Sequence, residues 1–394
     1  MSIDLFNQRA GDVLSQLEET GQLKHFYELT GPMGPVVNIA GRGDVLVLCS
    51  NNYLGLANNP DVVAAGIEGL RQYGAGTASV RFICGTFDCH RRIERSIAEL
   101  VGTEAALTYV SCWNANEALF PTACAPGDVI LSDELNHASI IDSCRLTNKK
   151  VQREVYPHSD LNVLESKLSE FAGPGNEGVC WVVTDGVFSM EGDVAHLADL
   201  VDLCRRRRAI LVVDDSHGIG VLGETGRGTP ELAGVLGEVD VITGTLGKAL
   251  GGGAGGYVAG SQRLIDLLQQ RSRPGLFSNA LPATVACSAN KAIEILQQQP
   301  AIVTKLHDNV KQVRAGLKLL GYECTDSPTA IIPIMIGNEA EAIRKSARLM
   351  ELGVMVIGFA FPVVPKGESR LRVQVSAALE PEHIEQALDA FAKL

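Results

Sequence analysis

The stretch AILVVDDSHGIG, residues 209–220, is an unbroken apolar run that ends in two acids and a histidine. Its apolar residues do not alternate with polar ones, which is typical of a strand covered by helices on both faces. Similar runs occur in AALTYV (105–110), VCWVVTDGVF (179–188) and VDVITG (239–244), with helical patterns between them. This alternation predicts an α/β domain built on a mostly parallel central sheet, with helices on both faces.

The whole chain is expected to divide into three parts. Residues 1–58 contain an amphipathic helix and short strands, and residues 59–283 form the large α/β domain. The pattern changes after RSRPGLFSNALP (271–282), so residues 284–394 are expected to form a smaller α+β domain. Within the large domain, residues 134–178 are interpreted as a long insertion between two strands.

Composition excludes several classes of function. The 394 residues carry a net charge of −12, which argues against nucleic acid as the main partner. No apolar run is long enough to span a membrane, and the N-terminal residues lack the pattern of a signal peptide. The ten cysteines are scattered without a CxxC pair and the eight histidines show no metal-binding spacing. We therefore expect a cytoplasmic protein with reduced cysteines, no metal and no membrane partner.

A single lysine lies in the stretch VDVITGTLGKALGGGAGGYVAG, residues 239–260. The stretch is not a phosphate-binding P-loop, because Ile242 stands where that motif needs glycine and Ala249 where it needs a hydroxyl. The run GGGAGG leads into the strand-like YVAG and not into a helix, so it does not fit a dinucleotide site either. Lys248 therefore needs another explanation.

Asp214 and Lys248 follow two apolar segments that are expected to be adjacent strands. Ligands of open α/β sheets bind outside the carboxyl ends of the strands, so both side chains are expected to face one crevice. Pyridoxal phosphate needs an amine for its Schiff base and an acid facing its ring nitrogen. The alternative is that Asp214 caps a loop and Lys248 is solvated, but their common position at strand ends favours the site.

Five motifs, in order along nearly the whole chain, resemble fold-type I pyridoxal-phosphate enzymes of the α-oxoamine synthase family: SNNYLGLA (50–57), NHASIIDS (136–143), TDGVFSMEGD (184–193), VDDSHGIG (213–220) and TGTLGKALGG (243–252). Three more are similar to the glycine C-acetyltransferase branch: ASVRFICGT (78–86), LFSN (276–279) and FPVVPKGESRLRVQVSA (361–377). The resemblance implies a fold-type I enzyme with pyridoxal 5′-phosphate bound as a Schiff base on Lys248.

The resemblance also implies the roles of the residues around the cofactor ring. Lys248 would move the α-proton of the substrate, and Asp214 would pair with the ring nitrogen. His217 would contact the phenolic oxygen with Ser189 beside it, and His137 would stack on the ring face. For a lone histidine a core or capping role is the ordinary alternative.

For the phosphate, the resemblance implies backbone amides of Cys112 and Trp113 at the start of a helix, together with the Thr245 hydroxyl. Ser278 would reach the phosphate from a second subunit, which implies a homodimer with shared active sites; a linker turn is the alternative. Asn51 and Arg372 would bind the substrate carboxylate, for which the planar guanidinium is suited.

The implied reaction condenses glycine with acetyl-CoA to 2-amino-3-oxobutanoate and CoA, as in threonine catabolism, with threonine dehydrogenase as a further expected partner. The alternatives are a sibling enzyme that makes 8-amino-7-oxononanoate, 5-aminolevulinate or a sphingoid base, and a non-catalytic subunit of the same fold. The sequence departs from the branch at Trp113, Asn114, Glu117 and Leu379. Trp113 and Glu117 are expected near the cofactor end of the site, which bears on acyl-group choice.

Overall fold

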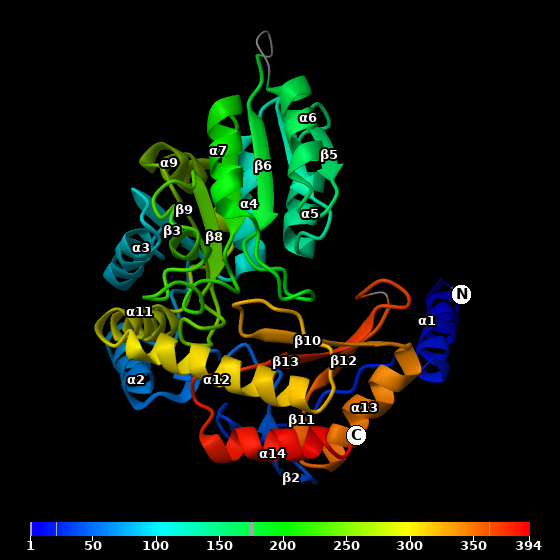
Figure 1. The fold of residues 1–394 in the computed structure, drawn as a ribbon. Coiled ribbons are helices and arrows are strands. Elements are labelled where there is room, and N and C mark those ends of the chain that lie inside the picture. The colour runs from blue at the N-terminus through cyan, green and yellow to red at the C-terminus, as the bar shows by residue number, and fades with distance from the viewer. Residues whose placement is uncertain (1, 21, 173–176, 362) are drawn as a thin grey trace.

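A seven-stranded sheet forms the centre of the larger part of the molecule (Figure 1). The computed structural model describes residues 2–20, 22–172, 177–361 and 363–394. The strand order is β3-β9-β8-β7-β6-β4-β5, and β9 alone runs antiparallel to its neighbours. The strands are β3 (Ala105–Tyr109), β4 (Val129–Asp133), β5 (Gln152–Tyr156), β6 (Cys180–Asp185), β7 (Ile210–Asp214), β8 (Val241–Thr245) and β9 (Gly256–Gly260). The expected mostly parallel sheet is confirmed.

Helices cover both faces of this sheet, as the unbroken apolar runs predict. Leu211 and Val213 of β7 belong to one buried cluster, which also contains Leu200 of α7. Val212 between them belongs to a second cluster, which contains Leu119 of α4. The helices of this part are α3 (Asp88–Val101), α4 (Cys112–Ala123), α5 (Ala138–Arg145), α6 (Leu161–Phe171), α7 (Leu197–Arg207), α8 (Thr229–Leu232), α9 (Gln262–Arg271) and α10 (Arg273–Phe277).

The expectation of an insertion over residues 134–178 is wrong. This segment contains α5, β5 and α6, and β5 pairs in parallel with β4 as the last strand of the sheet. Because β5 is an edge strand, Gln152, Arg153 and Glu154 are at least partly exposed, and its sequence lacks an apolar run. Residues 173–176 lie outside the described part of the chain.

Two small sheets form the other part of the molecule. One contains β10 (Ile331–Gly337), β13 (Ser369–Gln374) and β12 (Ile357–Phe359), all antiparallel; the other contains β1 (Val36–Ile39), β2 (Gly43–Val47) and β11 (Val354–Met355). The N-terminal strands thus share a sheet with a C-terminal strand. The helices are η1 (Leu56–Asn58), α2 (Pro60–Tyr73), α11 (Ala283–Gln298), α12 (Ala301–Leu319), α13 (Glu339–Glu351) and α14 (Pro381–Phe391). Boundaries at residues 58 and 283 remain a prediction.

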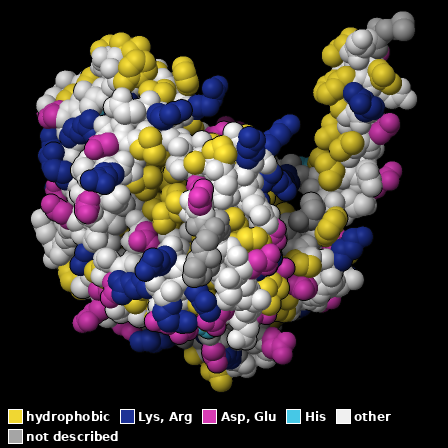
Figure 2. Space-filling view, turned by 90° about the horizontal axis from the view of Figure 1, so that it is seen from above, with side chains coloured by type: hydrophobic (Ala, Val, Ile, Leu, Met, Phe, Trp, Pro, Cys, Tyr) yellow, Lys and Arg dark blue, Asp and Glu magenta, His cyan; other side chains and the backbone are white. Residues whose placement is uncertain are grey.

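The first helix, α1 (Ser2–Glu19), projects from the body of the molecule and buries none of its residues (Figures 1 and 2). Figure 2 shows hydrophobic side chains along this projecting helix; they include Ile3, Leu5, Phe6, Val13 and Leu14, each more than half exposed. Among the described helices, none combines the length and the apolar character needed to cross a bilayer.

Candidate functional site

A cavity of about 230 Å³ opens at the carboxyl ends of β7 and β8, which pair in parallel with Asp214 opposite Thr243. Open α/β sheets bind their ligands at this edge. Eight of the eleven predicted site residues line the cavity: Cys112, Trp113, His137, Ser189, Asp214, His217, Thr245 and Lys248. The fold thus brings together segments that lie more than 130 residues apart in the chain.

Asp214 lines the cavity and is 5% exposed. One carboxylate oxygen accepts the backbone N–H of Ser216 at 2.9 Å, and the other accepts Asn116 Nδ2 at 2.6 Å. Burial alone would raise the pKa of Asp214, but these hydrogen bonds and the charge of Lys248 outweigh it and hold the pKa below its ordinary value. Asp214 is therefore a stable anion facing the cavity.

Lys248 follows β8 in a tight turn and faces the same cavity. Burial lowers the pKa of its amine, and the negative charge of Asp214 offsets part of that effect. A lowered pKa leaves more of the amine unprotonated near neutral pH, which makes it a usable nucleophile and base. The nearby Thr245 hydroxyl accepts the backbone N–H of Gly247 at 3.0 Å and so supports the turn.

The N-terminus of α4 supplies the anion-binding end of the cavity. Ser111 caps the helix by accepting the N–H of Asn114 at 3.1 Å, and Cys112 and Trp113 are its first two residues. The first N–H groups of a helix have no intrahelical partner and favour an anion. A Cβ atom on Gly256 of β9 would overlap the backbone of Ser111 and Cys112, so only glycine allows this close approach.

His137 and Trp113 form an aromatic wall of the cavity, with their ring centroids 6.1 Å apart and nearly perpendicular. His137 precedes α5, and its backbone N–H donates to Asp185 Oδ2 at 2.8 Å. Asp185 is 7% exposed, and burial, together with the charge of Asp214, raises its pKa well above the ordinary value. Two departures from the branch pattern lie nearby on α4, where Glu117 Oε2 accepts a hydrogen bond from Asn114 Nδ2 at 3.3 Å.

Two arginines of β13 lie on the same side of the strand, against the loop that carries Ser189. Arg370 is 3% exposed and forms ion pairs with Glu191 at 3.2 Å and Glu368 at 3.1 Å, so its charge is already compensated. Arg372 donates to the Ser189 carbonyl at 3.0 Å and forms no ion pair among the described residues. Its buried Nε has no hydrogen-bond partner in the described part of the chain. Arg372 is therefore the arginine that is free to bind an anion.

The three remaining predicted site residues, Arg372, Asn51 and Ser278, lie outside the lining of the cavity. Asn51 is joined to β13 by a hydrogen bond from Gln374 Nε2 at 2.8 Å. Ser278 follows α10 and does not line the cavity of its own chain. The resemblance assigns it to the site of a second subunit. Leu379, a departure from the branch pattern and not a predicted site residue, is buried in the core, with 1% exposure.

Sequence reasoning missed four residues on which the geometry depends. Asn116 holds Asp214, and Asp185 lines the cavity beside it. Tyr53 and Gln374 connect His217 with Arg372 and Asn51. A signal was present in two cases: Asn116 lies one helical turn after Cys112, and Gln374 lies two residues after Arg372 on the same face of a strand.

The donor set fits the expected pyridoxal phosphate. An amine, a stable carboxylate and a helix N-terminus meet in one cavity, which matches an aldehyde, a ring nitrogen and a phosphate. Across the described residues, no group of three or more His, Cys, Asp or Glu side chains could hold a metal ion, and the ten cysteines are free thiols.

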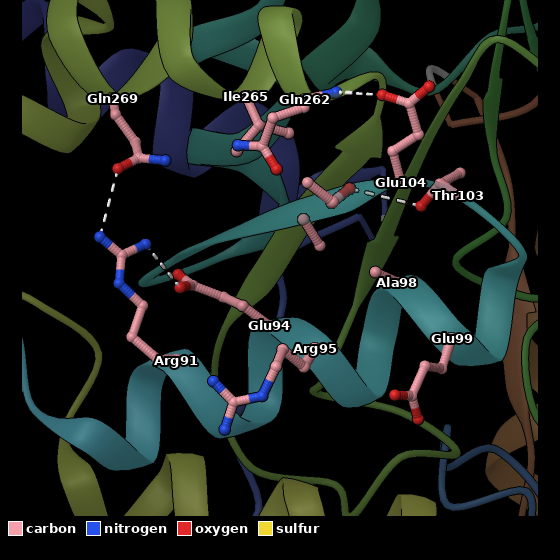
Figure 3. Close-up of a pocket in the computed structure, with 12 residues that line it drawn as sticks. Arg91, Glu94, Arg95, Ala98, Glu99, Thr103, Glu104, Gln262, Ile265 and Gln269 are labelled. Carbon is pink, nitrogen blue, oxygen red and sulfur yellow. Dashed lines mark hydrogen bonds and ion pairs between the residues drawn. The ribbon is translucent and has the colours of Figure 1, made fainter.

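A second hollow, between α3 and α9, carries no comparable chemistry (Figure 3). Its polar groups largely bind one another: Arg91 donates to Gln269 at 3.3 Å and to Glu94 at 3.2 Å, and the backbone N–H of Gln262 donates to Glu104 at 2.8 Å. This hollow belongs to the packing of the sheet edge.

Comparison with known proteins agrees with this geometry. The family profile described as "Aminotransferase class I and II" matches residues 43–391. The chain is 42% identical to the 2-amino-3-ketobutyrate coenzyme A ligase of Escherichia coli (strain K12), over 99% of this chain and 97% of that protein. It is 43% identical to the 8-amino-7-oxononanoate synthase of Symbiobacterium thermophilum, over 97% and 96% of the two chains. The solved serine palmitoyltransferase of Sphingomonas wittichii has a TM-score of 0.91 and 31% identity, over 98% and 96% of the two chains. The chain therefore belongs to the class I and II aminotransferase family and, within it, to the α-oxoamine synthases of fold type I.

Proposed function

We propose that the protein is a pyridoxal-phosphate-dependent acyltransferase that condenses glycine with acetyl-CoA to 2-amino-3-oxobutanoate and CoA. The observation that carries this proposal is the common cavity of Lys248, Asp214 and the N-terminus of α4. The 42% identity to 2-amino-3-ketobutyrate coenzyme A ligases supports the choice of substrates. In the reaction a C–C bond forms between the glycine α-carbon and the acetyl carbonyl carbon, and the C–S bond to CoA breaks.

Pyridoxal phosphate, when bound, supplies an aldehyde that captures the amine and a ring that withdraws electrons from the α-carbon. Lys248 would hold it covalently, and its unprotonated amine would accept the α-proton of glycine. Asp214 would keep the ring nitrogen protonated, and the first turn of α4, at Cys112 and Trp113, would bind the phosphate with the Thr245 hydroxyl. His217 and Ser189 would hold the phenolic oxygen.

The chain's other residues orient the substrate. Arg372 binds the glycine carboxylate through its guanidinium, which no described carboxylate compensates, with Asn51 joined to it through Gln374. His137 covers one face of the ring, and Trp113 adds bulk to the same wall, which keeps water from the reacting carbon.

Lys248→Ala is the direct test. We expect CoA release from glycine and acetyl-CoA to fall at least about a thousandfold, because the variant loses the covalent anchor and the base together. Far-UV circular dichroism should be unchanged. Lys311→Ala, on an exposed lysine, is the matched control. Substantial turnover by Lys248→Ala would reject the assignment.

The 43% identity to an 8-amino-7-oxononanoate synthase favours a second candidate, a sibling enzyme with another acyl-CoA. A matrix of acetyl-, succinyl-, pimeloyl- and palmitoyl-CoA against glycine, alanine and serine decides between them. The highest kcat/KM for any pair other than acetyl-CoA with glycine would replace the main proposal.

We also propose a cytoplasmic homodimer with shared sites, in which Ser278 of one copy serves the other. The exposed apolar side chains of α1 and of Phe82, Ile83 and Phe277 support an interface between copies. Light scattering should give twice 41.9 kDa. Threonine dehydrogenase remains a predicted partner only.

A further inference from the structure

A chain of hydrogen bonds joins Arg372 to His217 across the site. Arg372 Nη2 donates to Gln374 Oε1 at 3.1 Å, and Gln374 Nε2 donates to Tyr53 Oη at 2.7 Å. The Tyr53 hydroxyl lies 2.8 Å from His217 Nδ1. A branch runs from Gln374 Nε2 to Asn51 Oδ1 at 2.8 Å. Gln374 and Tyr53 are 2% and 1% exposed, so bulk water does not compete for these bonds.

The donors and acceptors of this chain admit one arrangement of protons. A guanidinium can only donate, so the Gln374 oxygen must face Arg372 and its amide group must face Asn51 and Tyr53. One amide proton then goes to each of those two oxygens. The Tyr53 oxygen is thereby used as an acceptor, and its own proton, in a buried site, needs an acceptor that the described residues offer only at His217 Nδ1.

The acceptor for that proton is His217 Nδ1, which must then be unprotonated. Burial lowers the pKa of His217 well below its ordinary value. Charge on Lys248, on Arg372 and, when it is protonated, on His137 acts in the same direction. A neutral imidazole that accepts at Nδ1 carries its proton on Nε2. This series of hydrogen bonds therefore selects one tautomer of His217.

The same series of hydrogen bonds fixes the orientation of Arg372. Its Nη1 donates to the Ser189 carbonyl at 3.0 Å, its Nη2 donates to Gln374, and the ring of Phe359 lies 4.5 Å from its Cζ. These three contacts leave the buried Nε without a partner in the described part of the chain. No described carboxylate pairs with this guanidinium, so an incoming carboxylate would compensate its charge.

We propose that Tyr53 and Gln374 are positioning residues that hold His217 as its Nε2–H tautomer and Arg372 and Asn51 in their binding orientation. This inference rests on the proposed function only in assigning a substrate carboxylate to Arg372 and Asn51 and a cofactor to His217. Gln374 is the branch point, because its single side chain contacts both carboxylate-binding residues and the tyrosine that sets His217. The cofactor end and the substrate end of the site are thereby coupled.

The primary test measures the tautomer itself. Nitrogen-15 NMR of protein labelled at histidine, with and without pyridoxal phosphate, reports which ring nitrogen carries the proton, and the His217 signal is the one lost in His217→Asn. We expect an unprotonated Nδ1 in the wild type. In Tyr53→Phe the signal should move toward a mixture of tautomers. Tyr322→Phe, which removes a hydroxyl bonded to the Phe391 carbonyl far from the site, is the control and should leave it unchanged.

Gln374→Glu gives a second, nearly isosteric test. Glutamate still accepts from Arg372, but it cannot donate to Asn51 or Tyr53. We expect the glycine Kd of the holoenzyme, measured by absorbance, to rise about tenfold. Both Gln374→Glu and Tyr53→Phe should weaken the hydrogen bond that His217 donates to the phenolic oxygen, so the anion of that oxygen is stabilised less. The midpoint pH of the change in visible absorbance of the holoenzyme should therefore rise by about one unit in both variants.

The outcomes separate the inference from the proposed function. A wild-type His217 protonated at Nδ1, or a tautomer unchanged in both variants, overturns the inference even if the enzyme is active. A protein that binds no pyridoxal phosphate but shows the expected tautomer supports the inference and rejects the function. Wild-type glycine affinity in Gln374→Glu overturns the role of Gln374.

Discussion

Replacing Asn116 with leucine should change the acid–base behaviour of Asp214. Asn116 is 3% exposed on α4, and its amide donates to Asp214 Oδ2 at 2.6 Å and to Ser139 Oγ at 2.9 Å. Leucine has nearly the same volume but cannot donate, so Asn116→Leu removes the hydrogen bond without opening a large cavity.

The size of the effect follows from this one bond. A hydrogen bond to a buried charged group contributes about 1.5 to 3 kcal/mol. Asn116 is among the groups that lower the pKa of Asp214, so its loss should destabilise the anion by about that amount and raise that pKa. The bond from the Ser216 backbone remains, and Asp214 should stay ionised at neutral pH.

The pyridoxal phosphate Kd of Asn116→Leu and of the wild type should be measured by absorbance between about pH 5 and pH 8. Near pH 8 we expect a Kd ratio of a few fold, and toward pH 5 a rise to about tenfold or more, because part of Asp214 becomes protonated in the variant alone. Asn290→Leu removes another buried asparagine, bonded to Glu294 away from the cavity, and is the control. A ratio that does not depend on pH would refute the reasoning.

Three further changes test the frame around the site. Gly256→Ala places a Cβ against the backbone of Ser111 and Cys112. The free energy of unfolding should therefore fall by about 1 to 3 kcal/mol, and the pyridoxal phosphate Kd should rise about tenfold. Gly76→Ala, where the added Cβ meets open space, is the control and should change neither quantity. Arg81→Met removes the 2.8 Å partner of the buried Glu94 carboxylate, which keeps Arg91 at 3.2 Å, and should cost about 2 kcal/mol in urea unfolding; a loss below about 1 kcal/mol would show that the pair is dispensable. His158 lies between Asp133 and Asp193 at 3.1 and 2.8 Å, which raise its pKa to about 10. Because this pKa is raised on folding, the stabilisation is complete below its ordinary value of 6.5 and is lost as pH rises toward 10. His158→Gln should therefore cost about 1 kcal/mol near pH 6, with the difference from wild type shrinking by pH 10; a constant difference would contradict this.

The amino-acid sequence by itself determined the fold class and the chemical centre. Unbroken apolar runs such as residues 209–213 report burial on both faces of a sheet, and that property is local to each strand. Polar residues directly after such runs must lie at the ligand-binding edge of a parallel sheet, which was enough to bring Asp214 and Lys248 together in the prediction. The edge strand β5 escaped prediction because exposure removes that apolar signal.

Only the tertiary structure decided how the site is supported. Whether Arg370 or Arg372 is free depends on Glu191 and Glu368, which pair with Arg370 and leave Arg372 uncompensated. The contacts of Asn116 with Asp214 and of Tyr53 with Gln374 join residues 98 and 321 positions apart. Hydrogen bonds need atoms within about 3 Å in a defined orientation, and chain spacing carries no such information until helices and strands are packed.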